Sequence, residues 1–164
     1  MNKLNIIQSK ILSWDEIKPH IARWRFKNQK IVFTNGCFDL VHRGHIEYLA
    51  KASDMGDVLI IGLNSDASVK AIKEEDRPVI DEESRSLILA SLRFVDAVVL
   101  FDEETPLQLI EHIQPDILVK GKDYASSEII GAETVKKKGG RVETIELVDG
   151  YSTSAIINKI RGEK

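Results

Sequence analysis

Hydrophobic residues gather in five short, nearly continuous runs, which are separated by longer stretches with helical spacing. The runs cover residues 30–34, 58–63, 97–101, 117–120 and 141–147, and Val, Ile and Leu dominate them. Continuous rather than alternating apolar runs of this length are typical of strands covered on both faces. The pattern therefore predicts five strands of a parallel sheet.

Amphipathic stretches predict the helices between these strands. They cover residues 44–53, 66–73, 81–94, 105–113 and 128–138, and a closing helix covers about 152–161. An additional helix is predicted to begin at Ser13, where Ser13 and Glu16 have the spacing of a capping box. Thr105 and Gln108 have the same spacing and predict a second capping box.

Strands that alternate with helices predict a doubly wound α/β fold, because parallel strands need helical crossovers. We expect a Rossmann-like five-stranded parallel sheet in the order 3-2-1-4-5. Residues 1–29 would form an N-terminal helical extension and residues 30–164 a single α/β domain. In such sheets ligands bind beyond the carboxyl ends of the strands, where the strand order reverses.

Composition and charge limit the classes of binding partner and the cellular compartment that the sequence predicts. The 164 residues carry a net charge of −3, whereas proteins that bind nucleic acid or anionic membranes are usually basic. The single cysteine, Cys37, excludes an intramolecular disulfide and a multi-cysteine zinc site. The N-terminus lacks the pattern of a signal peptide, and no apolar run is long enough to span a bilayer. We therefore expect a cytoplasmic protein without nucleic-acid or membrane partners.

The stretch after the first strand combines two histidines with two glycines. His42 and His45 fall on one face of a helix start, and Gly36 and Gly44 leave room for a ligand near the backbone. A helix N-terminus attracts phosphate, and imidazole N–H groups can stabilise developing charge. A zinc site would need further ligands at matching spacing, which this stretch lacks, so we expect no metal ligands. The combination favours a phosphate site over two surface histidines.

This stretch, GCFDLVHRGH at residues 36–45, resembles the signature of the cytidylyltransferase-like nucleotidyltransferase family. That signature has His-x-Gly-His at its core, preceded by Gly-x-Phe-Asp. Matching order and spacing continue through residues 93–96, 120–124 and 149–154. Within the family, the sequence most resembles the D-glycero-β-D-manno-heptose 1-phosphate adenylyltransferases, by residues 64–70, 77–79, 118–124 and 150–154.

The resemblance implies roles for individual residues. His42 and His45 would be catalytic and would grip the α- and β-phosphates. The implied nucleotide contacts are Asn35, Gly36, Cys37, Phe38, Asp39, Gly44, Arg93, Gly121, Asp123, Gly150, Tyr151, Ser152, Thr153 and Ser154. The implied contacts with the substrate phosphate are Lys70, Lys73 and Arg77.

Three of these assignments also have a plainer physical explanation. Ser152 would be an ordinary N-cap of the closing helix, and that helix start could still bind phosphate. Gly121 would equally suit a simple turn. The charged stretch around Arg77 would otherwise be a solvated face.

The resemblance also implies a reaction. AMP from ATP, with Mg²⁺ carried on the ATP, would be transferred to a sugar 1-phosphate, giving ADP-heptose for lipopolysaccharide core synthesis and pyrophosphate. A separate sugar kinase would act first, and a homodimer is expected because relatives are commonly dimers.

Two alternatives stand beside the adenylyltransferase. One is a cytidylyltransferase for glycerol 3-phosphate or phosphoethanolamine. The other is a non-catalytic nucleotide-binding α/β module. The glycerol-phosphate cytidylyltransferases carry an arginine before the segment that corresponds to residues 150–154. Its absence from residues 147–149 favours the heptose branch.

Overall fold

The computed structural model describes residues 2–73, 76–122 and 129–162. No helix in these ranges is long and apolar enough to cross a membrane. The strands are β1 (Ile31–Gly36), β2 (Val58–Asn64), β3 (Ala97–Phe101), β4 (Ile117–Gly121) and β5 (Arg141–Ile145). The helices are α1 (Lys3–Gln8), α2 (Trp14–Phe26), α3 (Arg43–Ser53), α4 (Asp66–Ile72), α5 (Glu82–Ser91), α6 (Leu107–Ile113), α7 (Ala132–Lys137) and α8 (Thr153–Arg161).

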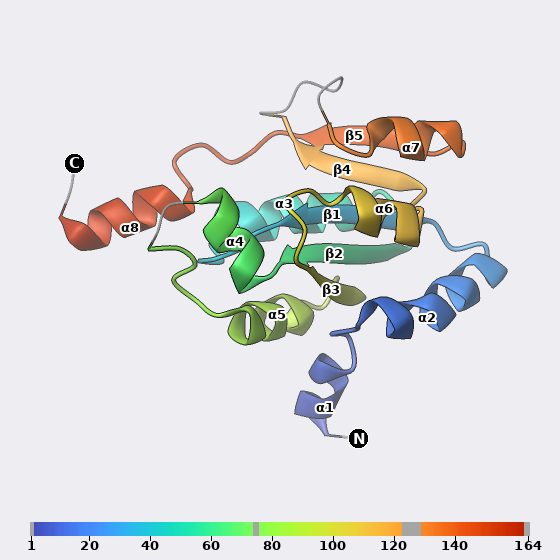
Figure 1. Ribbon diagram of the computed structural model, residues 1–164, viewed down its shortest axis with the longest axis horizontal. Helices are drawn as coiled ribbons and strands as arrows, with labels where there is room; N and C mark the ends of the chain where they lie inside the picture. The colour runs from blue at the N-terminus through green and yellow to red at the C-terminus, as the bar shows by residue number, and fades with distance from the viewer. Residues whose placement is uncertain (1, 74–75, 123–128, 163–164) are drawn as a thin grey trace.

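The five strands form one parallel sheet in the order β3-β2-β1-β4-β5, which confirms the predicted fold class and strand order (Figure 1). β1 is central, and the chain leaves it toward β2 on one side and, later, toward β4 on the other. The strand order therefore reverses beside β1. Ligands are expected beyond the carboxyl end of this strand.

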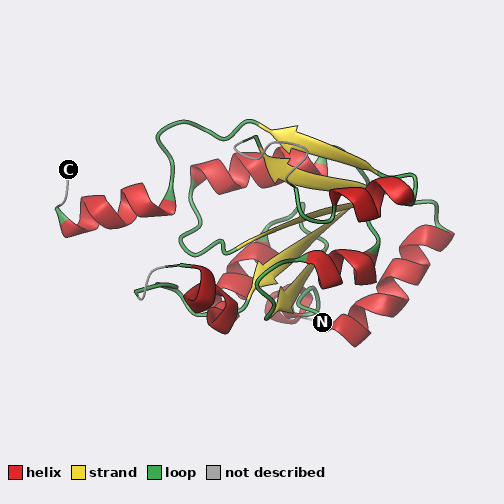
Figure 2. Ribbon diagram, turned by 45° about the horizontal axis from the view of Figure 1, so that its top comes forward, coloured by secondary structure: helices red, strands yellow, loops and turns green. Residues whose placement is uncertain are grey.

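Helices cover both faces of the sheet (Figure 2). One core cluster joins α2, α6 and α7 to side chains such as Phe33 and Ile60, and the other joins α3 and α5 to side chains such as Val32 and Ile61. Neighbouring strand residues thus point to opposite helical layers, which explains why the predicted strands are continuously apolar. α8 differs from these helices, because it has no buried residue and projects away from the sheet (Figure 1).

The N-terminal residues pack along the edge strand β3. The Ser13 capping box is confirmed: the Ser13 hydroxyl accepts from the Glu16 N–H, and the Glu16 carboxylate accepts from the Ser13 N–H. Before this helix, Ile11 forms a parallel bridge with Val98. Such a bridge covers backbone groups that an open edge would expose. The short helix α1 was not predicted from the sequence.

Three predicted boundaries are wrong for local reasons. Pro106 rather than Thr105 is the N-cap of α6, and no side chain caps that helix, so the second capping box does not form. α5 ends at Ser91 rather than at residue 94, because Leu92 has extended backbone angles. β5 ends at Ile145 because its partner strand ends at Gly121, the residue paired with Ile145. A fourth boundary is also wrong: α7 begins at Ala132 with Gly131 as its N-cap, so the described residues 129–131 are not part of the helix predicted from residue 128.

Candidate active site

A cavity of about 560 Å³ lies beyond the carboxyl ends of β1 and β4, where the strand order reverses. Most of the site residues expected from the sequence line it. These are Asn35, Gly36, Cys37, Phe38, Asp39, His42, Gly44, His45, Lys73, Arg77, Gly121, Tyr151, Ser152, Thr153 and Ser154. The structure therefore brings together segments that lie more than 100 residues apart in the chain.

The starts of α3 and α8 meet at this cavity. A Cβ atom on Gly44 would lie 3.0 Å from His42 Cε1 and 3.2 Å from Tyr151 Cβ, so only glycine fits there without displacing a neighbour. The Arg43 guanidinium lies over the Tyr151 ring, 5.5 Å from its centroid. The Ser152 hydroxyl accepts a hydrogen bond from the Ala155 N–H and so is the N-cap of α8. Two helix N-termini thus border one space, where they favour an anion.

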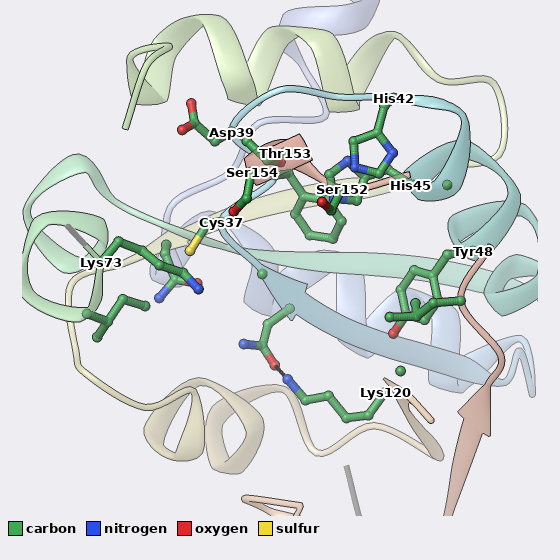
Figure 3. A pocket seen from close by; sticks show the side chains of 18 of the residues that line it. Cys37, Asp39, His42, His45, Tyr48, Lys73, Lys120, Ser152, Thr153 and Ser154 are labelled. Atoms are coloured by element: carbon green, nitrogen blue, oxygen red, sulfur yellow. Dashed lines mark hydrogen bonds between the residues drawn. The ribbon is translucent and has the colours of Figure 1, made fainter. Parts of the chain in front are cut away.

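The two histidines form a stacked pair beside these helix ends (Figure 3). Their ring centroids are 3.9 Å apart, and Phe38 packs edge-on against His45 with centroids 5.2 Å apart. Both Nδ1 atoms are buried and have no hydrogen-bond partner within the described residues. Buried polar atoms normally have a partner, so these two nitrogens are exceptions among the buried polar atoms of the described residues.

Both rings are neutral at pH 7. Burial lowers the pKa of His42. Burial, together with the neighbouring His42, lowers the pKa of His45 to about 4. A neutral imidazole keeps one N–H donor, and that donor can be directed at a phosphate oxygen.

This low pKa predicts that His45 destabilises the fold as the pH falls. The unfolded chain binds the proton near pH 6.5 and the folded chain only near pH 4, so stability declines between these values. We expect a loss of about 1 kcal/mol between pH 7 and pH 5, less than a fully buried ring would give. Urea denaturation of wild type and of His45→Gln at both pH values measures it. Equal pH slopes for the two proteins would contradict the low pKa.

Asp39 lies in the loop that follows β1, and it is 1 % exposed. Its carboxylate accepts hydrogen bonds from Arg77 Nε at 2.5 Å and from the backbone N–H groups of Val79 and Ile80 at 2.9 Å. Burial alone would raise the pKa of Asp39, but these donors outweigh it and hold the pKa below its usual range. Asp39 and Arg77 therefore bind each other at the border of the cavity.

Two lysines bring positive charge to the cavity from different elements (Figure 3). Lys73 follows α4, and Lys120, near the end of β4, donates a hydrogen bond to the Asn35 side chain. The Cys37 thiol points into the space between them, and burial raises its pKa, so it stays protonated at neutral pH. The cavity thus offers cations opposite the histidine pair.

Four expected site residues do not line the described cavity. Arg93 is exposed between α5 and β3, at the amino end of β3, whereas the cavity lies at the carboxyl ends. Lys70 is exposed on α4, one turn before Lys73. Gly150 has a φ of +79° and forms the turn before Tyr151 without lining the space. Asp123 lies outside the described residues.

Sequence analysis missed several side chains at the site. Tyr48 lines the cavity, and its hydroxyl bonds to Thr34 Oγ1 at 2.8 Å. Lys120 belonged to a segment that carried the resemblance but was given no role. Arg85 lies fully buried beneath the cavity. Its sequence signal was available, because Arg85 shares the apolar face of its helix with Leu89, four residues on.

The cytidylyltransferase-like family model matches residues 33–159 of the chain. A solved structure, the lipopolysaccharide core biosynthesis protein from Thermoplasma volcanium, superposes with a TM-score of 0.62 at 27 % sequence identity. That similarity covers 76 % of this chain and 99 % of the other.

Curated relatives named bifunctional protein HldE match almost the whole chain. The protein from Citrifermentans bemidjiense is 56 % identical over 152 residues, which are 93 % of this chain and 31 % of that protein. The protein from Wolinella succinogenes is 53 % identical over 155 residues, which are 94 % of this chain and 32 % of that protein. The chain thus spans about a third of the length of these relatives.

Proposed function

The chain belongs to the cytidylyltransferase-like family, and from this premise we propose that it transfers AMP from ATP to a sugar 1-phosphate and releases pyrophosphate. One observation carries the proposal. The starts of α3 and α8 and the stacked pair of His42 and His45 border a single cavity at the strand-order reversal. That arrangement suits a triphosphate, since helix N-termini and N–H donors are what phosphate oxygens bind.

The proposed chemistry is one in-line displacement. An oxygen of the sugar phosphate attacks the α-phosphorus of ATP, a new P–O bond forms, and the bond to pyrophosphate breaks. The attacking phosphate is ionised at neutral pH, so no strong base is needed. Catalysis then depends on position and on charge stabilisation. The neutral rings of His42 and His45 would donate N–H groups to the α- and β-phosphates.

Mg²⁺ would enter as part of the nucleotide substrate and neutralise the departing pyrophosphate. Among the described residues, no group of three or more His, Cys, Asp or Glu could hold a metal ion. Asp39 is bound by Arg77, which leaves Glu104 as a carboxylate that borders the cavity. Mg²⁺ usually keeps several waters and binds substrate phosphates, so phosphate oxygens would be its main ligands.

Lys73 is the cation best placed for the second substrate's phosphate, because it lines the cavity on the side away from the histidines (Figure 3). Arg77 would act mainly by holding Asp39 and its loop. Arg93 would reach the nucleotide, and Lys70 the second substrate, only if the ligated protein rearranges. We assign the transfer to residues 30–164, with residues 1–29 as a packing extension.

We propose D-glycero-β-D-manno-heptose 1-phosphate as the sugar, which makes the product ADP-heptose for the lipopolysaccharide core. Two similarities support this proposal. The chain has more than 50 % sequence identity to two HldE proteins, and it resembles the solved structure of a lipopolysaccharide core biosynthesis protein. The sugar phosphate would come from a kinase, and the reaction would take place in the cytoplasm. A homodimer is part of the same proposal.

The test is a panel of pyrophosphate-release assays. ATP and CTP are each combined with heptose 1-phosphate, glycerol 3-phosphate and phosphoethanolamine, with Mg²⁺ present. We expect release only from ATP with the heptose phosphate. Release from CTP with either other phosphate would establish the cytidylyltransferase instead. Binding of ATP without release from any pair would point to a non-catalytic module.

A further inference from the structure

Arg85 is an arginine with no exposed surface, and it bonds to the backbone of Cys37 and Asn64, two residues that line the cavity. One guanidinium nitrogen donates to the Cys37 carbonyl at 2.6 Å and to the Asn64 carbonyl at 2.8 Å. The other two donate to the Ile80 carbonyl at 3.0 Å and to the Asp66 carboxylate at 2.7 Å. Arg85 therefore ties α5 to the ends of β1 and β2 and to the start of α4.

The bond to Cys37 matters because the next residue is strained. Phe38 has a φ of +44°, a left-handed conformation that is rare for a bulky side chain. Such a conformation persists only where surrounding contacts hold it. Before Phe38, Arg85 holds the Cys37–Phe38 peptide at its carbonyl oxygen. After Phe38, Asp39 is anchored because its carboxylate accepts hydrogen bonds from the Val79 and Ile80 N–H groups. The strained residue is thus fixed on both sides.

Phe38 passes this constraint to the histidine pair. Its ring packs edge-on against His45, which stacks on His42. On its other side the ring lies close to Gly36, where a Cβ atom would be only 3.1 Å away. A rotation of the Cys37–Phe38 peptide would therefore move the ring against which His45 rests.

We propose that Arg85 is a positioning residue of the transfer reaction: by holding the Cys37 carbonyl it keeps Phe38 in its left-handed conformation and His45 in place for the phosphates. The inference rests on the proposed function. Arg85 itself does not line the cavity, so its side chain would not contact a substrate bound there. Its effect reaches the reaction only through the backbone and through Phe38.

Arg85→Lys is the informative variant. It keeps the positive charge, but a lysine ammonium group is compact and cannot donate to three carbonyls and a carboxylate at once. The planar guanidinium can, because its N–H donors are spread over three nitrogens. We expect kcat to fall by on the order of 10²-fold, as displacement of a catalytic group by about 1 Å does. KM for ATP should change by less than about threefold, because none of the groups that Arg85 bonds to lies on α8. Arg85→Gln is the second variant, should the lysine variant not fold.

Loss of stability has to be separated from loss of position. Ile17→Ala is the matched control, because Ile17 is equally buried but packs on the opposite face of the sheet. It should lower the melting temperature and leave kcat unchanged below the melt. NMR of the ring protons of the four histidines gives a second readout. We expect the His42 and His45 signals to shift in Arg85→Lys and to stay unchanged in Ile17→Ala.

Either of two results would overturn the inference. One is a folded Arg85→Lys protein whose kcat stays within about twofold of wild type. The other is a loss of activity with unmoved His42 and His45 signals. An inactive wild-type protein would instead overturn the proposed function. The ring signals would then still decide whether Arg85 positions His45.

Discussion

His45→Ala is expected to lower kcat for the proposed transfer by on the order of 10²-fold while the protein remains folded. The ring is held in advance by its stack on His42 and by the edge of Phe38, so it needs no reorganisation when charge develops on the phosphates. Deleting one such preorganised donor typically costs 10²- to 10³-fold in turnover. Steady-state kinetics with saturating ATP and sugar phosphate measures the effect.

The control for this variant is His20→Ala. His20 lies on α2, where its ring packs near Trp24 with centroids 5.6 Å apart, and it does not line the cavity. We expect this control to keep wild-type kcat. A His45→Ala protein with the thermal melt of a folded domain and with kcat within about threefold of wild type would show that the imidazole has no part in the chemistry.

The fold was predictable because its signals are local and repeated. Each buried strand is a continuous apolar run in the sequence. That the strands are parallel follows from the helices between them, because a helical crossover connects parallel strands. What was missed depends on partners elsewhere in the chain. β5 stops where β4 stops, and α1 is a six-residue helix that the Asn2 side chain caps. Neither a partner's length nor a marginal helix can be deduced from the periodicity of the segment itself.

The candidate site also contains residues that local sequence predicts and residues that it does not. The residues from Asn35 to His45 are contiguous and follow a strand, so the sequence alone placed them at the carboxyl edge. α8 joined them because residues 150–154 carried a family resemblance. Arg93 was assigned by resemblance alone, and the topology places it at the opposite end of β3. A motif transfers a role, but it does not test whether the chain brings the residue to the ligand.

Interactions across long sequence separations were the least predictable. Arg77 was expected to bind phosphate because the family resemblance implies that this loop supplies cations to the substrate. In the structure its guanidinium meets the carboxylate of Asp39, 38 residues away. Arg85 was overlooked for the related reason that two of its three carbonyl acceptors, those of Cys37 and Asn64, come from distant backbone segments. Charge in a sequence indicates what a side chain can bind, and packing decides which acceptor it meets.

Asp39→Ala is expected to destabilise the fold by about 3 kcal/mol or more. It leaves the Arg77 guanidinium, whose side chain is only 13 % exposed, and two backbone N–H groups without their acceptor. Removing one partner of a buried ion pair costs roughly 3–5 kcal/mol, because the remaining charge stays buried and unpaired. For a domain of this size that corresponds to a drop of roughly 10 °C in melting temperature. Urea denaturation at pH 7 measures the free energy of unfolding directly.

Asp39→Asn and Glu143→Ala make this prediction specific. The amide oxygen of Asp39→Asn could still accept from the Val79 and Ile80 N–H groups, but its NH2 group would face Arg77. This variant should therefore cost less than alanine, while it still leaves the guanidinium without an acceptor. Glu143 pairs with Arg141 at 3.0 Å on the surface, and its removal should change the free energy of unfolding by less than about 1 kcal/mol. The loop that Asp39 anchors also carries Phe38. We therefore expect kcat to be lower in both Asp39 variants, even when it is measured at temperatures well below their melting temperatures. If Asp39→Ala has the same free energy of unfolding as wild type, the Asp39 side chain does not hold this loop, and the strain at Phe38 must be maintained by Arg85 alone.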